Sequence, residues 1–155
     1  MRPLQVQTES HKGHEETGRR IYALAREFSG DLGEMSKWDF LQFWDFVRQI
    51  PYIDDPTLLK TPSHELIARP AHLLNPRIFP ALDCKKKTTL ILAYCFANGI
   101  PALAIASSEN GTGEIHHVFP LVFIGGLWRS ADPTFPEYEF GQKKPLLSYA
   151  EVLNE

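Results

Sequence analysis

The sequence predicts an α+β fold, in which N-terminal helices and a cysteine-bearing helix pack on an antiparallel sheet of at least three strands. Helical patterns fill the first part of the chain, and strand patterns follow from position 101 onward. Between them lie residues 83–99, DCKKKTTLILAYCFANG, whose apolar run is too long for most strands. Helices first and strands afterwards is the order typical of α+β domains.

The composition is that of an ordinary globular protein. We expect a polar mobile arm over residues 1–18 and a single domain over residues 19–155. The formal net charge of −3 and the pI of about 6.1 give no basic field for nucleic acid or anionic membranes. No apolar stretch is long enough to span a membrane or to act as a secretion signal, which predicts a cytoplasmic or particle-associated protein. The oligomeric state is left open.

Two helices are expected before position 50. Apolar residues recur on one stripe from position 19 until Ser29 and Gly30 end the first helix. The second begins at Ser36, which stands at the capping-box distance from Asp39. Its many aromatic residues indicate a central core helix rather than an aromatic ligand groove.

The connection to the cysteine helix is rich in proline. Residues 50–56 are expected to be extended and then to turn, because prolines at both ends disfavour helix. A short helical turn is expected over residues 63–68. Residues 69–82 are predicted to form a long loop, and long ordered loops often line functional sites.

The helix over residues 83–99 has a cap at each end and a cysteine in its first turn. Asp83 is a good N-cap, and Gly99 is placed to end the helix. Cys84 then stands where unpaired backbone N–H groups and the helix dipole favour a thiolate, the reactive form of cysteine. Three lysines follow, at positions 85 to 87; they oppose the dipole but also favour a thiolate. The alternative is a small core cysteine without chemistry.

The two cysteines cannot form a disulfide within the chain. Cys84 and Cys95 are eleven residues apart, about 16 Å of helix rise, whereas a disulfide tolerates roughly 7 Å between Cα atoms. Cys95 lies within the apolar run and is interpreted as a core residue, and Cys84 as a free thiol.

Three strands are expected after the cysteine helix, over residues 101–107, 115–124 and 127–132. Gly125 and Gly126 form the two-residue link of a hairpin between the last two strands. A cysteine nucleophile needs a base within hydrogen-bond reach and usually a third group that orients this base. The register of the hairpin therefore tests which histidine can act as the base of Cys84.

The hairpin register selects His117 and Asp132. A two-residue turn pairs positions 124 and 127, which places Phe119 opposite Asp132 on the sheet face that also carries His117. His117 and Asp132 are then diagonal neighbours, roughly 7–8 Å apart at the backbone, within reach of an imidazole and a carboxylate. His116 points to the other face. Pro120 cannot donate to a ladder and favours an edge strand or a bulge, and a bulge between His117 and Phe119 would reverse the choice.

A zinc site that combines Cys84 with the histidines is the metal alternative. Zinc prefers ligands at compact spacing, and the sequence holds no CxxC or HxxxH pattern. We therefore expect no metal and no organic cofactor.

Five short motifs follow one another in the C-terminal half. In order they are Asp83-Cys84, Gly99-Ile100-Pro101, His117-Val118-Phe119, Gly125-Gly126-x-Trp128 and Asp132-Pro133-Thr134. This succession resembles the transglutaminase-like superfamily of papain-type thiol enzymes. The match covers about 50 residues, and the stretch from Tyr52 to Asp55 loosely resembles the Tyr-x-x-Asp often seen upstream of that core.

The resemblance implies the same triad as the hairpin register, with Cys84 as nucleophile, His117 as base and Asp132 as the group that orients the base. It also implies a cysteine helix packed on an antiparallel sheet. The chain departs from many relatives in two respects: lysines follow Cys84 where acidic residues are common, and Pro120 interrupts the strand after the histidine.

These residues predict a thiol-dependent acyl-transfer enzyme that acts on a peptide or protein amide. A peptidase or amidase is favoured over a transglutaminase, because the chain is short and has no recognisable calcium loop. Two alternatives stay open: a catalytically inactive module for binding or particle assembly, and a hydrolase of cell-wall peptides.

Overall fold

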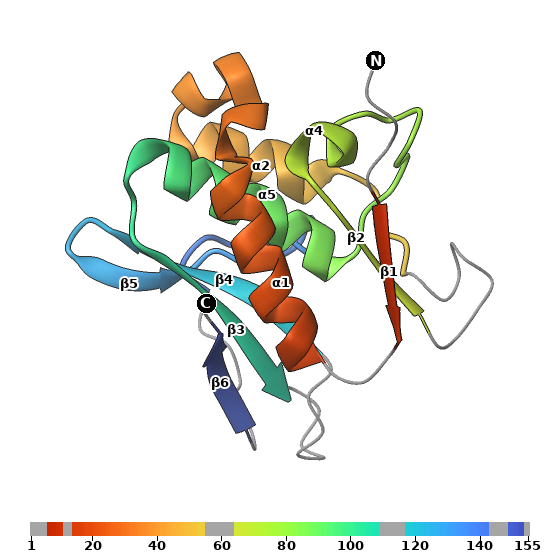
Figure 1. The fold of residues 1–155 in the computed structure, drawn as a ribbon. Helices are drawn as coiled ribbons and strands as arrows, with labels where there is room; N and C mark the ends of the chain where they lie inside the picture. Colours follow the sequence, from red (N-terminus) through yellow and green to blue (C-terminus); the bar gives the residue numbers. More distant parts are fainter. Residues whose placement is uncertain (1–5, 11–13, 55–63, 109–116, 143–148, 154–155) are drawn as a thin grey trace.

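The computed structural model describes residues 6–10, 14–54, 64–108, 117–142 and 149–153. It confirms the α+β prediction, with helices packed against an antiparallel sheet (Figure 1). Within these residues no helix has the length and apolar character needed to cross a membrane. The elements, in order, are β1 (Val6–Ser10), α1 (His14–Glu27), the 3-10 helix η1 (Ser29–Lys37), α2 (Phe40–Gln49), β2 (His64–Ala68), α4 (Pro70–Leu73), α5 (Cys84–Asn98), β3 (Ala102–Ser108), β4 (His117–Ile124), β5 (Leu127–Ser130) and β6 (Tyr149–Leu153).

Helix α5 lies at the centre of the fold. The main sheet has the antiparallel order β5-β4-β3-β6, and α5 contacts its strands β3 and β4 as well as α1, α2 and η1. In Figure 1 the helices gather above this sheet. Every residue from Cys84 to Cys95 is buried. A helix enclosed on all sides needs apolar residues all round, and the run from Leu90 onward supplies them.

Both predicted caps of α5 are confirmed. The Asp83 side chain accepts a hydrogen bond from the backbone N–H of Lys86, at 3.0 Å. At the other end Gly99 adopts the left-handed conformation, with φ of 67°, and the N–H of Ile100 donates to the carbonyl of Cys95 at 2.9 Å. Local hydrogen bonds therefore fix where the helix begins and ends.

The hairpin register is also confirmed. Across the Gly125-Gly126 turn, Ile124 pairs with Leu127 and Leu121 pairs with Ser130. The pairing of β3 with β4 runs through Pro120 without a bulge.

Strand β4 tolerates Pro120 because the position of its missing N–H does not face the β3 ladder. Its carbonyl accepts from the N–H of Ala131 at 3.0 Å. In an antiparallel strand the N and O atoms of one residue point to the same neighbour, so the missing N–H faces the end of β5, where the ladder stops.

The prediction of a polar arm over residues 1–18 is wrong for the part that the structure describes. Strand β1 occupies five of these residues and pairs with β2, and α1 begins at His14 rather than at position 19. The helical turn expected over residues 63–68 is wrong for the same reason, because His64–Ala68 forms β2. Val6 pairs with Ala68, 62 positions away. Because each strand is stabilised by this distant partner, no local sequence pattern predicts either of them.

Three further boundaries differ from the prediction. Ser36 does not start a helix, because its hydroxyl donates to the carbonyl of Gly33 at 2.7 Å within η1. Helix α2 begins at Phe40, four residues after the expected start, with Asp39 as its N-cap, so Trp38 lies before the helix and not inside it. The expected loop over residues 69–82 contains the short helix α4, whose first residue is Pro70.

The aromatic helix α2 is buried along one face. Phe43 stacks on Tyr94 of α5 with ring centroids 5.0 Å apart, and the indole N–H of Trp44 donates to the carbonyl of Ala131 at 2.8 Å. Leu41 and Phe46 are exposed, so the helix is a wall of the core rather than its centre.

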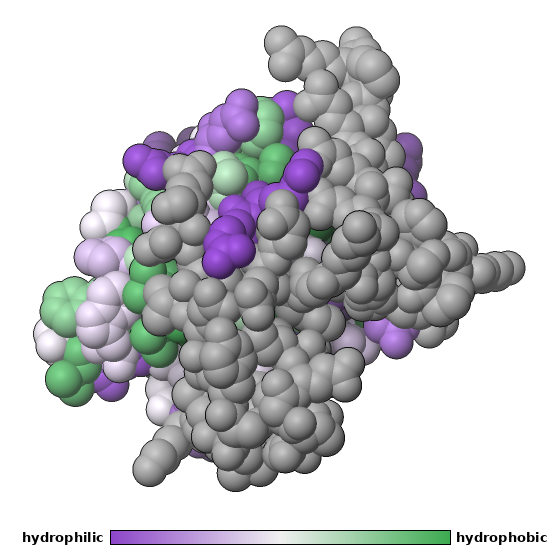
Figure 2. All heavy atoms as spheres, turned by 60° about the horizontal axis from the view of Figure 1, so that its bottom comes forward, coloured by the Kyte–Doolittle hydropathy of each residue, from purple (hydrophilic) through white to green (hydrophobic). Residues whose placement is uncertain are grey.

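Apolar residues also face solvent at the tip of the main sheet. Phe123, Leu127 and Trp128 of the β4–β5 hairpin are exposed, and Figure 2 shows hydrophobic residues gathered at this end of the molecule. The register of this hairpin therefore depends on backbone pairing and on the glycine turn more than on burial of its outer face.

Two glycines allow a matched test of the α5 cap. A Cβ added at Gly99 or at Gly30 meets no atom within 4 Å, but only Gly99 has a positive φ. We expect Gly99→Ala to lower the free energy of unfolding by about 1–2 kcal/mol, and Gly30→Ala to leave it unchanged or raise it slightly. Urea unfolding followed by circular dichroism measures both. Equal effects of the two substitutions would contradict this account of the cap.

Candidate active site

Cys84 is the first residue of α5, and only 5% of it is exposed. The helix cap fixes its backbone, and its side chain meets His117, which opens strand β4. Helix α5 packs directly on β4, so the two elements bring these residues together across 33 positions of sequence.

His117 lies between Cys84 and Asp132. Its Nε2 is 2.6 Å from Oδ2 of Asp132, and its side chain also hydrogen-bonds Cys84. Since Nε2 is engaged by the carboxylate, Nδ1 is the ring nitrogen left for the sulfur. The three side chains selected from the sequence are therefore in contact; His116 lies outside the described residues.

The environment of His117 favours the imidazolium. Burial opposes the charged ring, but the negative charge of a Cys84 thiolate and the Asp132 carboxylate outweigh it and raise the pKa of His117 to about 10. The arrangement thus favours the charged form of the His117 ring at neutral pH.

The second oxygen of Asp132 is held by Thr134. The backbone N–H of Thr134 donates to Oδ1 at 3.1 Å, and its hydroxyl donates to the same atom. Both residues are buried, with 2% and 1% of each exposed. One carboxylate oxygen is therefore fixed by the turn, which aims the other at His117.

Asp83 carries charge into the core beside Cys84. Burial alone would raise its pKa, but the ammonium groups of Lys85 and Lys86 and the hydrogen bonds from Lys86 hold the pKa of this carboxyl below its usual range. The two lysine Nζ atoms lie 3.3 and 3.2 Å from Oδ2. The N-cap carboxylate thus offsets one of the positive charges at the helix start.

Lys87 faces a different partner from the two preceding lysines. It is fully buried, and its Nζ donates to the carbonyl of Thr134 at 2.9 Å and to that of Arg48 at 3.2 Å. Burial lowers the pKa of Lys87 to about 8, although the charge of Asp132 acts in the opposite direction.

Tyr52 and Phe135 form an aromatic pair beside Cys84. The N–H of Leu82 donates to the carbonyl of Pro51 at 2.8 Å, which ties this segment to the start of α5. The rings of Tyr52 and Phe135 are 4.9 Å apart. Burial, together with the negative charges of Cys84 and Asp83, raises the pKa of Tyr52.

Sequence reasoning found Cys84, His117 and Asp132 but assigned no role to the residues around them. The spacing of Asp132 and Thr134 is a signal that was available, because an Asp side chain commonly accepts from the N–H two residues on. The burial of three successive lysines had no signal in the sequence, since such a run is most often solvated.

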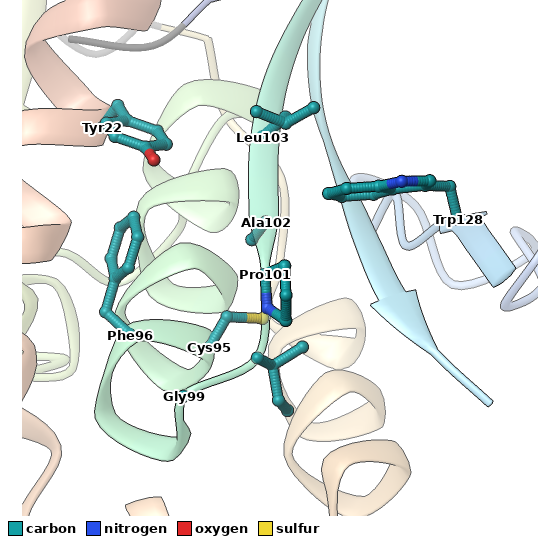
Figure 3. Close-up of a pocket in the computed structure, with 9 residues that line it drawn as sticks. Tyr22, Cys95, Phe96, Gly99, Pro101, Ala102, Leu103 and Trp128 are labelled. Atoms are coloured by element: carbon teal, nitrogen blue, oxygen red, sulfur yellow. The ribbon is translucent and has the colours of Figure 1, made fainter. Parts of the chain in front are cut away.

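A pocket of about 420 Å³ lies at the other end of α5. Its lining includes Cys95, Phe96 and Trp128, and Figure 3 shows the Cys95 sulfur close to Pro101. The pocket is lined mainly by apolar residues and contains none of the three candidate site residues. Among the described residues no cluster of three or more His, Cys, Asp or Glu side chains could hold a metal ion.

The chain has little similarity to known proteins. No protein-family model and no curated protein matches the chain. One solved structure from Cytophaga hutchinsonii, described as a "Putative Cysteine Protease", is 19% identical with a TM-score of 0.40. The similarity covers 88% of this chain and 46% of that one, so the chain spans less than half of its length. The resemblance of the motifs to the transglutaminase-like superfamily remains a prediction.

The titration of His117 tests the electrostatics of the site. We expect its pKa near 10 to fall toward the ordinary value of 6.5 in Cys84→Ser, because the thiolate charge is lost. Asp132→Asn should lower it too. NMR of the imidazole nitrogens measures both, and Cys95→Ser is the control that leaves the titration unchanged.

The same shift gives a dependence of stability on pH. Because folding raises the pKa of His117, the imidazolium stabilises the fold fully below pH 6.5, and this contribution is lost as the pH rises through about 10. A parent protein in which His117 titrates near 6.5 would contradict the ion pair.

Asp83→Asn tests the charged N-cap. The substitution removes the buried carboxylate that the ammonium groups of Lys85 and Lys86 share, so we expect the free energy of unfolding to fall by about 3–5 kcal/mol. Asp39→Asn is the matched control, because Asp39 is an exposed N-cap that makes no side-chain cap bond. Its effect should stay within about 0.5 kcal/mol in the same urea titration. Similar losses in the two variants would show that Asp83 acts as an ordinary cap.

Proposed function

We propose that the chain is a cysteine hydrolase that cleaves an amide bond of a peptide or protein. The observation that carries the proposal is the buried series of contacts from Cys84 through His117 to Asp132. A thiol, a base and an orienting carboxylate in this order are the parts that nucleophilic acyl transfer requires. The resemblance of the motifs to the transglutaminase-like superfamily points to the same three residues.

In the first half of the reaction the Cys84 thiolate attacks the amide carbonyl carbon, and a tetrahedral intermediate forms. The His117 imidazolium then gives its proton to the amide nitrogen, so that the C–N bond breaks and the amine leaves. Asp132 accepts the Nε2 hydrogen bond throughout and holds the ring with Nδ1 toward the sulfur. The product of this half is a thioester on Cys84 and a neutral His117.

In the second half water takes the place of the amine. Neutral His117 removes a proton from the water as its oxygen attacks the thioester, and the thiolate leaves with the imidazolium restored. The carboxylic acid product carries the water oxygen. Both halves transfer the proton at Nδ1 of the same imidazole, while Nε2 stays bonded to Asp132.

The helix start supplies part of the stabilisation of the oxyanion. The N–H of Cys84 belongs to the first turn of α5, where backbone donors have no carbonyl partner within the helix. A donor aimed at the developing negative charge lowers the barrier. Tyr52 and Phe135 lie beside this position and would contact the substrate.

The acceptor distinguishes the related reactions. Water gives a peptidase or amidase, whereas a primary amine would give a transglutaminase. Incubation of the protein with a casein-like protein, with muropeptide fragments and with an added amine separates them by product mass. Cleavage of muropeptides alone would assign the cell-wall alternative.

The first test of the proposal is alkylation of Cys84. We expect iodoacetamide to label Cys84 rapidly between about pH 6 and 7, where an ordinary thiol with a pKa of about 8.5 reacts slowly. His117→Ala removes the imidazolium that stabilises the thiolate, so labelling should slow by at least about tenfold. Mass spectrometry of the digested protein measures the rate at each cysteine.

Cys95 is the internal control on the same helix. It is fully buried, and burial raises its pKa to about 12, so it should stay unlabelled in the folded protein. Slow labelling of both cysteines that is indifferent to His117 would overturn the proposal and favour the binding or assembly alternative.

A further inference from the structure

We propose that Lys87 is a positioning residue of the site, whose buried ammonium group ties the Asp132–Thr134 turn to the helix that carries Cys84. This inference rests on the proposed function and extends it to a residue outside the triad. Lys87 acts on the reaction through Asp132 and His117 and does not touch the reacting atoms.

The first observation is the place of Lys87 on α5. It lies three residues after Cys84, so the two side chains leave the same side of the helix one turn apart. No part of Lys87 is exposed. A lysine that only solubilised the protein would place its charge in water, and this one does not.

The second observation is the direction of its hydrogen bonds. Lys87 Nζ donates to the carbonyl of Thr134, 47 positions along the chain, and to that of Arg48. Thr134 in turn donates twice to Oδ1 of Asp132, and Oδ2 of the same carboxylate meets His117. A continuous series of contacts thus runs from Lys87 to the imidazole.

The third observation is the charge around Lys87. From the turn after β5 it faces Asp132, whose carboxylate favours the ammonium form. From α2 it faces only the backbone of Arg48, because that guanidinium is bound to the carbonyl of Tyr138 at 2.6 Å and to Asp45. On its own helix Asp83 lies one turn before it and is paired with two other lysines. Asp132 is therefore the principal counter-charge.

A buried cation here has two effects on the site. It fixes the turn that aims Asp132 at His117, and its charge favours the anionic form of Asp132. The pKa of Lys87, about 8, means that this charge is present at pH 7 and is lost at moderately alkaline pH. An exposed lysine would keep its charge through that range.

The test follows the NMR titration of His117 and the alkylation rate of Cys84 in the parent protein, Lys87→Met and Lys87→Arg. In the parent we expect two steps in the His117 signals, a small one near pH 8 from Lys87 and the main one near 10. The step near pH 8 reports that the charge of Lys87 acts on the imidazole, and the alkylation rates of the variants report whether it positions the site.

The variants separate charge from packing. Lys87→Met should lose the step near pH 8 and slow alkylation at pH 6.5 by about tenfold, because the turn that aims Asp132 at His117 is released. Lys87→Arg keeps a permanent cation; it should lose the same step but retain alkylation within about threefold. Lys86→Met is the matched control, because Lys86 is buried one position away and pairs with Asp83. It should keep the step near pH 8.

Two results would overturn the inference. One is the absence of a step between pH 7 and 9 in the titration of His117 in the parent protein. This measurement needs no variant. The other is rapid alkylation in the parent that Lys87→Met leaves unchanged, which would leave the proposed hydrolase intact. Slow alkylation of the parent would instead overturn the proposed function and this inference together.

Discussion

The buried start of α5 is the constraint on which the rest of the structure depends. Asp83 carries a negative charge into the core, and an ion taken out of water costs several kcal/mol unless it is paired. Lys85 and Lys86 supply the pairing, and the same carboxylate caps the helix. Because these bonds fix the first turn, they also fix the backbone of Cys84. The position of the sulfur is thus a consequence of how the charges are buried.

Burial of the apolar part of α5 offsets the free-energy cost of enclosing this polar start. The side chains of Leu90, Ile91 and Leu92 are fully buried, and each contributes roughly 1.5–3 kcal/mol when it is removed from water. They hold the helix against the sheet and against α1, and the polar turn is enclosed as a result. Trp44 then reaches from α2 to the carbonyl of Ala131, the residue before Asp132. The hydrophobic core and the candidate site therefore share one helix and one set of neighbours.

The two cysteines show how environment separates chemistry from packing on one helix. Cys95 sits among apolar side chains, and burial raises its pKa to about 12, which keeps it a neutral thiol. Cys84 is almost as buried but lies at a helix start, in contact with an imidazole whose pKa is raised. Residue type and exposed area are nearly the same at the two positions. The difference lies in the neighbouring charges, which is why the proposed nucleophile is Cys84.

The sequence by itself determined the features that depend on near neighbours. The caps of α5 involve residues three to five positions apart, and the two-residue glycine turn fixed the register that puts His117 and Asp132 on one sheet face. Only the tertiary structure decided the pairing of β1 with β2, the burial of the lysines and the contact of Lys87 with Thr134. These contacts join segments that are tens of residues apart. Their free energy comes from enclosure by the whole fold, which no local pattern of residues records.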